Sequence, residues 1–165
     1  NIKITSIDAS QPIIDMARRY FYLPNSVEVY CQQAEQFVEE TTTQYDVVLC
    51  DLFIGEKNPE FLFTELFYKQ LSQITSCKAV VSLNIKAQNN EQLLNMLFTI
   101  KKYFPNIVLI EFEDYSNIVI ICSYQTIPNQ TILQQRLLDF TGVDLSGLDR
   151  AIEKMSYIPS RGQKM

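Results

Sequence analysis

Residues 46–51 read DVVLCD, four apolar side chains between two aspartates. An unbroken apolar run of this length is typical of a strand that is buried on both faces of a parallel sheet. The segment that follows, residues 52–59 (LFIGEKNP), contains Gly55 and Pro59, so we expect the strand to end at Asp51 and a loop to begin. The sequence therefore places a carboxylate at the mouth of a buried strand.

Strand and helix patterns alternate on both sides of this segment. The other expected strands are 2–7, 27–31, 79–85, 106–112 and 117–124, and the expected helices are 11–22, 33–41, 60–74, 90–103 and 129–140. This order predicts an α/β fold whose sheet is mostly parallel, joined by right-handed crossovers and covered by helices. Only residues 113–116 separate the last two strands, which predicts a C-terminal antiparallel hairpin with one antiparallel strand at an edge.

The domain organisation follows from the same pattern. We expect one α/β domain over 1–140 and a C-terminal surface tail over 141–165, with a short helix near 146–155. A chain of 165 residues is long enough to bury a core without disulfides or metals.

Composition excludes several classes of function. The chain has no His, so Ser-His-Asp and Cys-His catalysis are excluded and the commonest metal ligand is missing; we expect no metal site. A net charge of −5 argues against a basic nucleic-acid face. The four Gly have no phosphate-cradling spacing. The four Cys include no C-x-x-C pair, which favours a reducing compartment, and no apolar run of 18 residues suits a membrane span; we expect a cytoplasmic protein.

Ligands of such sheets bind beyond the carboxyl ends of the strands. The residues at these positions are Asp8, Gln32–Ala34, Asp51–Glu56 and Asn84. Asp8 could accept hydrogen bonds from both hydroxyls of a ribose, or it could be an acid favoured at a helix start. Gln33 could meet the edge of a nucleobase beside the small Ala34, or the pair could simply start a helix.

Asp51 could orient an amine or act as a general base, or it could be a surface carboxylate at a strand end. The apolar residues 52–54 that follow it, starting with Leu52, suit a pocket wall or lid better than a solvated turn.

Three stretches resemble the spermidine synthase-like proteins, which have the class I S-adenosylmethionine-dependent methyltransferase fold. These stretches are residues 7–21 (IDASQPIIDMARRYF), 27–34 (VEVYCQQA) and 45–68 (YDVVLCDLFIGEKNPEFLFTELFY). The family pattern is hydrophobic-Asp-Pro before a helix that ends in Ala-Arg-x-Tyr-Phe, and Tyr-Asp-Val followed by Asp-x-Phe-x-Gly-Glu-x-x-Pro and Leu-x-Thr-x-x-Phe-Tyr. The resemblance covers about residues 2–125.

The resemblance implies roles for individual residues. Asp8 takes the position of the ribose-binding acid, and Gln33, with Ala34 beside it, that of the Asp that contacts the adenine amino group. Asp51, followed by Leu52, takes the position of the carboxylate that orients and deprotonates the amine nucleophile. Ile54 stands where the family often has a second acid, which makes putrescine a doubtful substrate.

The resemblance also implies a preceding strand and a glycine-rich turn that hold the methionine part of the cofactor. Neither lies in these 165 residues, so we expect a truncated N-terminus, a sheet whose first strand is missing, and weak cofactor binding by this chain alone.

Three functions remain open. The first is a transferase domain that binds S-adenosylmethionine or decarboxylated S-adenosylmethionine and alkylates a small nucleophile, by methyl or aminopropyl transfer. The second is a truncated or degenerate, non-catalytic scaffold or oligomerisation module. The third, less favoured by the sequence, is a different nucleotide-binding α/β protein, since fold alone does not fix function. We expect a small-molecule substrate, no nucleic-acid or membrane partner, and self-association into a homo-oligomer through apolar side chains around the missing strand.

Overall fold

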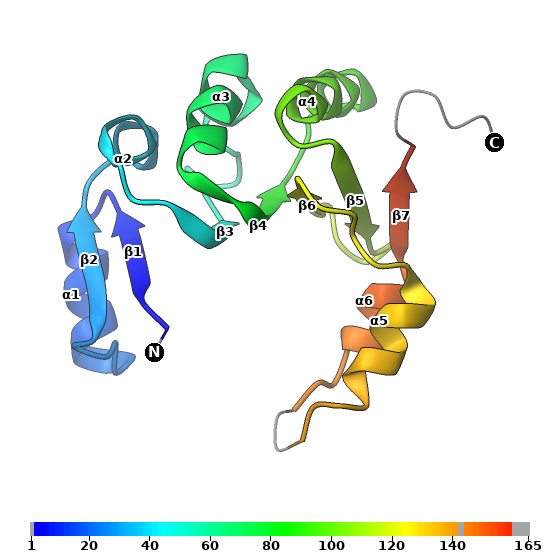
Figure 1. Ribbon diagram of the computed structural model, residues 1–165. Helices are drawn as coiled ribbons and strands as arrows, with labels where there is room; N and C mark the ends of the chain where they lie inside the picture. The colour runs from blue at the N-terminus through cyan, green and yellow to red at the C-terminus, as the bar shows by residue number, and fades with distance from the viewer. Residues whose placement is uncertain (1, 142–143, 160–165) are drawn as a thin grey trace. The chain divides into compact units, whose positions relative to one another are not determined.

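The computed structural model describes residues 2–141 and 144–159 (Figure 1). The chain divides into two compact units, Asn1–Thr43 (unit 1) and Gln44–Met165 (unit 2), and each is described by itself. No described helix has the length and apolar character that a bilayer crossing requires.

Unit 1 is a β-α-β segment with one further helix. Its elements are β1 (Ile4–Asp8), α1 (Gln11–Tyr20), β2 (Val27–Cys31) and α2 (Ala34–Glu40). β1 and β2 pair in parallel, with Ile4 opposite Val27 and Asp8 opposite Cys31, so their carboxyl ends lie side by side. Its buried anchors are Ile14 of α1 and Phe37 of α2.

Unit 2 contains a five-stranded sheet in the order β3-β4-β6-β5-β7. Its elements are β3 (Tyr45–Cys50), the 3-10 helix η1 (Glu60–Phe63), α3 (Glu65–Gln73), β4 (Thr75–Ile85), α4 (Asn90–Tyr103), β5 (Asn106–Glu111), β6 (Ile118–Ser123), α5 (Gln130–Leu137), α6 (Leu148–Glu153) and β7 (Met155–Ile158). β3 pairs in parallel with β4, whereas β6 is antiparallel to both β4 and β5. β3, β4 and β5 therefore run in one direction, and the α/β fold with a mixed sheet and a C-terminal hairpin is confirmed.

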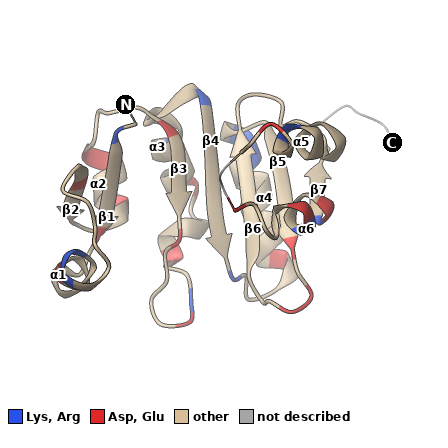
Figure 2. Ribbon diagram, turned by 90° about the horizontal axis from the view of Figure 1, so that it is seen from below, with Lys and Arg blue, Asp and Glu red and all other residues tan. Residues whose placement is uncertain are grey.

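The sequence predicts that the antiparallel strand of the hairpin lies at an edge, and this is wrong for β6. β6 is inserted between β4 and β5, with Ile120 opposite both Leu83 and Leu109. The physical reason is that β4 offers β6 a second ladder of backbone pairs, from Val80 opposite Ser123 to Ile85 opposite Ile118, which the hairpin pattern alone does not contain. Figure 2 shows β6 between its two neighbours.

Part of the core of unit 2 lies between the sheet and the helices α3 and α4 (Figure 1), and a second cluster joins Val108 and Ile110 to Ile152 and Met155. Its largest fully buried side chains are Tyr68, Phe104, Leu62, Leu71, Leu83, Ile85, Met96, Ile100, Ile107, Ile120, Val81 and Val108. These residues come from η1, α3 and α4, from Phe104 directly after α4, and from the three central strands.

The predicted helix over 60–74 is interrupted at Thr64. The Thr64 hydroxyl donates to the Phe61 carbonyl at 2.8 Å and accepts from the Phe67 backbone amide at 3.4 Å. Thr64 thereby ends η1 and caps α3, because its side chain replaces the hydrogen bonds that a continuous helix would make.

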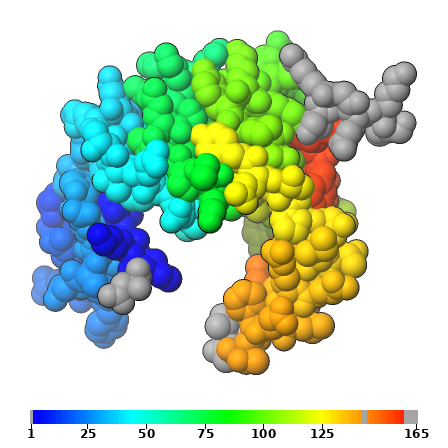
Figure 3. Space-filling view, in the orientation of Figure 1, coloured from blue at the N-terminus to red at the C-terminus, as the bar shows by residue number. Residues whose placement is uncertain are grey.

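The prediction that the C-terminal segment lies on the surface is wrong for α6 and β7. β7 pairs antiparallel with β5, and Ile152 and Met155 are buried against Val108 and Ile110. In the space-filling view the atoms of β7 lie against those of the segment that leads into α5 (Figure 3). The domain boundary itself, 1–140 and 141–165, stays a prediction.

The prediction that residues 46–51 are buried on both faces is also wrong. β3 is an edge strand of its sheet, and Val47 and Leu49 are 61% and 76% exposed. Apolar content alone does not distinguish an edge strand from a central one, since it records side-chain chemistry and not the number of neighbouring strands.

Candidate functional site

The carboxylate of Asp51 lies directly after β3, at the carboxyl edge of the sheet in unit 2. Its Oδ1 accepts a hydrogen bond of 2.9 Å from Nδ2 of Asn84, which stands near the end of β4. Oδ1 of Asn84 in turn accepts a hydrogen bond of 3.1 Å from Nδ2 of Asn117, which directly precedes β6. Three neighbouring strands thus contribute one polar side chain each to a single hydrogen-bonded chain.

The loop after β3 is fastened to the sheet by Asn58. Its Nδ2 donates to the carbonyls of Leu52 at 2.8 Å and Asn84 at 3.1 Å, and its Oδ1 accepts from the Lys86 backbone amide at 2.6 Å. Asn58 is a buried polar residue, and these contacts satisfy its amide, as burial requires. The loop therefore leaves β3 and returns to the end of β4 in a fixed path.

The tip of this loop is a tight turn between Ile54 and Lys57, whose backbones hydrogen-bond in both directions. Gly55 takes φ +63° there, a conformation that side chains disfavour. Figure 2 shows the loop projecting beyond the end of β3 with acidic and basic segments at its tip. Ile54 is 74% exposed, so the turn presents an apolar side chain next to charged ones.

Asp8 and Gln33 lie at the carboxyl ends of the two paired strands of unit 1. One oxygen of Asp8, Oδ1, accepts a 2.7 Å hydrogen bond from the Ser10 backbone amide, so the residue also shapes the start of α1. The Asp8 carbonyl accepts from the Gln32 amide at 3.1 Å, which joins the two strand ends. Gln33 is the N-cap of α2 but makes no side-chain cap bond, and Ala34 begins the helix half-buried.

The structure thus brings Asp8, Gln33 and Ala34 to one end of unit 1, and Asp51 and the half-buried Leu52 to one end of unit 2. Their assignment to a common cofactor site stays a prediction.

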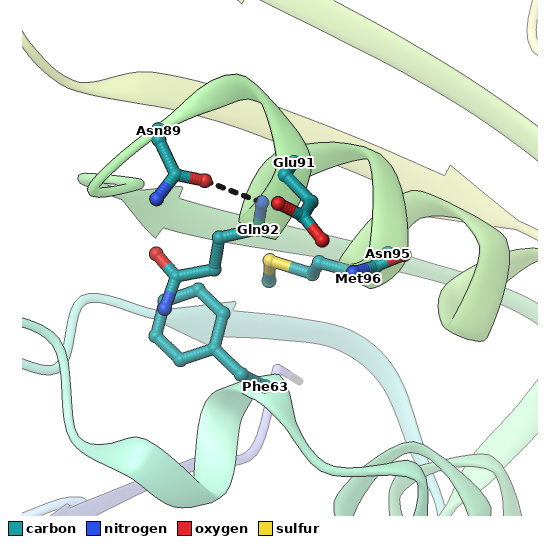
Figure 4. A pocket seen from close by; sticks show the side chains of 6 residues that line it. All are labelled: Phe63, Asn89, Glu91, Gln92, Asn95 and Met96. Carbon is teal, nitrogen blue, oxygen red and sulfur yellow. Dashed lines mark hydrogen bonds between the residues drawn. The ribbon is translucent and has the colours of Figure 1, made fainter.

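A pocket of about 340 Å³ opens between η1 and the first turns of α4 (Figure 4). It is lined by Phe63, Asn89, Glu91, Gln92, Asn95 and Met96. Asn89 Oδ1 accepts from the Gln92 amide, and Gln92 Oε1 accepts from the Gln88 amide, both at 2.8 Å. Two of the lining side chains therefore serve as the cap of α4, and none of the predicted site residues lines this pocket.

The thiols near the core are not activated. Burial raises the pKa of the Cys50 thiol to about 12 and that of Cys122 further above its ordinary value. Burial also raises the pKa of the Tyr68 hydroxyl, which donates to the Leu62 carbonyl at 2.7 Å. These groups stay protonated at neutral pH and are unsuited to nucleophilic catalysis. Among the described residues, no group of three or more Cys, Asp or Glu is placed to hold a metal ion.

Sequence reasoning singled out Asn84 but missed Asn117 and Asn58. Asn117 opens an antiparallel strand, and the first residue of such a strand lies at the edge where its parallel neighbours end. The position of Asn117 at the start of the predicted strand 117–124 is therefore the sequence signal that points to it. For Asn58, the position before Pro59 gives no comparable signal.

The comparisons with known proteins bear on this arrangement. No family model matches the chain. The chain is 28% identical over 147 residues to a polyamine aminopropyltransferase from Vibrio vulnificus, and 26% identical over 135 residues to an N-terminal histidine N-methyltransferase from Emericella nidulans. The matches cover 82% and 74% of this chain but only 46% and 24% of these curated relatives, so the chain spans less than half of their length.

Solved structures match at lower identity. A probable spermidine synthase from Corynebacterium glutamicum has a TM-score of 0.71 at 17% identity, covering 93% of this chain and 56% of that one. Human methyltransferase-like protein 13, solved with SAH, has a TM-score of 0.69 at 17% identity, covering 87% and 74%. A spermidine synthase solved with the transition state analogue AdoDATO has a TM-score of 0.64 at 18% identity, covering 77% and 48%.

The fold is therefore that of the class I S-adenosylmethionine-dependent methyltransferases. Within this class, the resemblance to the spermidine synthase-like proteins that the sequence indicates is confirmed, since both a polyamine aminopropyltransferase and spermidine synthases are among the matches.

Proposed function

We propose that the chain is a transferase domain that binds S-adenosylmethionine or its decarboxylated form and alkylates a small nucleophile. The observation that carries the proposal is the Asp51 carboxylate, held by Asn84 at the carboxyl edge of the sheet in unit 2. This edge is where α/β sheets bind their ligands. The relatives named above, a polyamine aminopropyltransferase and a histidine methyltransferase, support the reaction class.

The cofactor supplies an electrophilic carbon attached to a sulfonium, and the nucleophile displaces the thioether from that carbon. Asp51 accepts a hydrogen bond from the nucleophile's N–H, which points the nitrogen lone pair toward the carbon. It then takes the proton that the new ammonium releases, so that charge balances. Such a displacement gains most of its rate from positioning, which suits a chain without His.

The residues of unit 1 suit the nucleoside part of the cofactor. Asp8 uses Oδ1 for Ser10, and its other oxygen can accept from a ribose hydroxyl. Gln33 follows the end of the neighbouring strand, two residues after Cys31, which pairs with Asp8. Its carbonyl can accept from the adenine amino group beside Ala34.

The proposed site favours a nucleophile with one amine over a diamine. Ile54 presents an apolar side chain that is 74% exposed, and it offers no charge to a second ammonium. A charge-assisted hydrogen bond to that ammonium would contribute about 1.5–3 kcal/mol. Its lack disfavours putrescine.

Location and assembly belong to the same proposal. All four cysteines are free thiols, which supports a reducing, cytoplasmic compartment. We expect a homo-oligomer that acts on a small molecule and has neither nucleic-acid nor membrane partners. A non-catalytic scaffold is the competing function, favoured by Gln33 and Ile54 at positions where the family pattern has acids.

Calorimetric titration separates the two functions. The chain, and a version extended at its N-terminus if the gene encodes one, is titrated with S-adenosylmethionine, decarboxylated S-adenosylmethionine and methylthioadenosine. Binding of any of these, together with turnover that Asp51→Asn lowers at least tenfold, supports the transferase. Lack of binding in the extended chain, or unchanged turnover of Asp51→Asn, contradicts it.

A further inference from the structure

We propose that Asn84, supported by Asn117, is the positioning residue that sets the direction of the Asp51 carboxylate. This inference rests on the proposed function, in which that carboxylate orients the nucleophile. Asn84 and Asn117 come from two strands that the cofactor residues do not use, and their side chains reach Asp51 in series, at 2.9 Å and 3.1 Å.

The donors and acceptors of the three side chains fix the direction of this series of hydrogen bonds. An ionised carboxylate has no proton to donate, so Asn84 must turn its Nδ2 toward Asp51. Its Oδ1 then points the other way and needs a donor, which Nδ2 of Asn117 supplies. Reversing either amide would place two acceptors or two donors face to face. Each amide therefore fixes the orientation of the next, and the series of hydrogen bonds ends on Oδ1 of Asp51.

Asn84 is a more rigid support than Asp51 itself. Its backbone lies within the β4–β6 ladder, opposite Val119, and its carbonyl accepts from Asn58 Nδ2 at 3.1 Å. Asp51 follows the last residue of β3 and is exposed. An exposed carboxylate rotates among several rotamers, and a hydrogen bond to a fixed amide selects one of them.

The consequence for the reaction is a division of work between the two oxygens. Oδ1 is engaged by Asn84, whereas no hydrogen bond in residues 2–141 and 144–159 engages Oδ2. The side of Asp51 that carries Oδ2 is thus presented to an N–H donor in a constant direction. Loss of Asn84 should leave the carboxylate in place but let it rotate.

The first experiment tests the hydrogen-bonded chain without any turnover. The side-chain amide signals of Asn117 are followed by NMR in the 15N-labelled chain, in Asp51→Asn, in Asn84→Ala and in the double variant. We expect Asp51→Asn to shift the Asn117 amide when Asn84 is present and to leave it unmoved in the Asn84→Ala background. Equal shifts in both backgrounds, or no shift in either, would overturn the proposal.

The second experiment measures kcat and KM. We expect Asn84→Ala to lower kcat about tenfold and Asn117→Ala about threefold, with the cofactor KM changed less than about twofold, because orientation and not binding is lost. Asn84→Asp, which replaces the donor by an acceptor, should lower kcat more than Asn84→Ala does. Asn95→Ala, an exposed amide on α4, is the matched control and should not change kcat.

The two proposals fail in different ways. If Asp51→Asn leaves turnover unchanged, or the protein shows none, the proposed function fails, and the NMR cycle still decides whether the chain of hydrogen bonds exists. If Asp51→Asn abolishes turnover but Asn84→Ala has the kcat of the unaltered protein, positioning by Asn84 is refuted alone.

Discussion

Tyr22 stores backbone strain at the end of α1. Among the described non-glycine residues it alone has a positive φ, 54°, and its side chain is 88% exposed. The helix end is closed by the backbone amides of Phe21 and Leu23, which both donate to the Ala17 carbonyl. A left-handed residue allows this closure, and glycine adopts that conformation without the clash of a Cβ atom.

We predict that Tyr22→Gly raises the free energy of unfolding by about 0.5–1 kcal/mol, because relief of about 1–2 kcal/mol of left-handed strain outweighs the entropy cost of about 0.5–1 kcal/mol that glycine adds. Urea denaturation measures the change. Phe21→Gly is the matched control: this residue is also exposed but has φ −111°, so its replacement should destabilise. Equal effects of the two substitutions would show that strain is not the cause.

The four cysteines differ in reactivity. Cys31 and Cys77 are exposed, whereas burial raises the pKa of Cys50 to about 12 and also raises that of Cys122. Because the thiolate is the reactive form, we predict that a thiol reagent at pH 8 modifies two thiols quickly and the other two only on unfolding. Mass spectrometry of the labelled chain gives the count, and rapid modification of a third thiol would contradict the assigned burial.

The junction of η1 and α3 depends on one buried hydroxyl. Tyr68 and Leu62 are both fully buried, and the Tyr68 hydroxyl donates to the Leu62 carbonyl at 2.7 Å. Tyr68→Phe leaves that carbonyl without its donor, so we predict a loss of about 1–3 kcal/mol in the free energy of unfolding. Tyr115→Phe, at a site that is 69% exposed, should cost close to nothing. Similar losses in thermal denaturation of both variants would disprove the role of the buried contact.

Gln130 of α5 fastens the turn between α6 and β7. Its Nε2 lies 2.9–3.2 Å from the carbonyls of Ile152, Glu153 and Met155. We predict that Gln130→Ala increases the rate of tryptic cleavage at Arg150 and Lys154 about tenfold, because local opening becomes less costly. Gln134→Ala, on an exposed part of the same helix, should leave the rate unchanged. If both variants are cut alike, other contacts hold this segment.

The elements with strong periodicity could be predicted from the sequence. The strand over 27–31 and the helix over 90–103 have the predicted bounds, because each has a clear apolar pattern between polar turns. β7 was missed, since its sequence MSYI is short and half polar, and it becomes a strand only by pairing with β5. The position of β6 was missed for a similar reason: strand order depends on tertiary packing, which local pattern does not contain.

The same division holds for the candidate site. Asp51 follows β3 and Asn84 stands near the end of β4, so the rule that ligands bind at the carboxyl ends of strands indicated both. Asn58 contacts Asn84 from 26 positions away in the sequence, and Asn117 contacts the same residue from 33 positions away. No local signal marks such contacts.

For the whole molecule, we expect the free energy of unfolding to depend on pH mainly on the acid side. With no His, the chain has few groups that titrate near neutral pH. The pKa of Glu65 is lowered by hydrogen bonds from Lys102 and Tyr103, and that of Asp144 by hydrogen bonds from Ser146. A carboxyl whose folded pKa is lowered stabilises the fold above its unfolded pKa, and this contribution is lost as the pH falls through the folded value.

We therefore predict that stability changes little between pH 6 and 8 and falls below about pH 4.5, near the ordinary carboxyl range. Thermal denaturation across this range measures it. Glu65→Gln removes one of the two carboxyls whose pKa is lowered, so the loss of stability below about pH 4.5 should be smaller in this variant. An unaltered acid profile in this variant would mean that its contacts with Lys102 and Tyr103 do not matter for stability.

The hydrogen bonds of Asn58 to Leu52, Asn84 and Lys86 have a consequence for the chemical stability of the protein. Asparagine side chains deamidate when the backbone nitrogen of the next residue attacks the amide and closes a succinimide ring. The next residue here is Pro59, whose nitrogen carries no hydrogen and is already part of a ring, so this route is closed. The amide that joins the Asp51 loop to β4 is thus chemically durable, and the loop should keep its path over long storage.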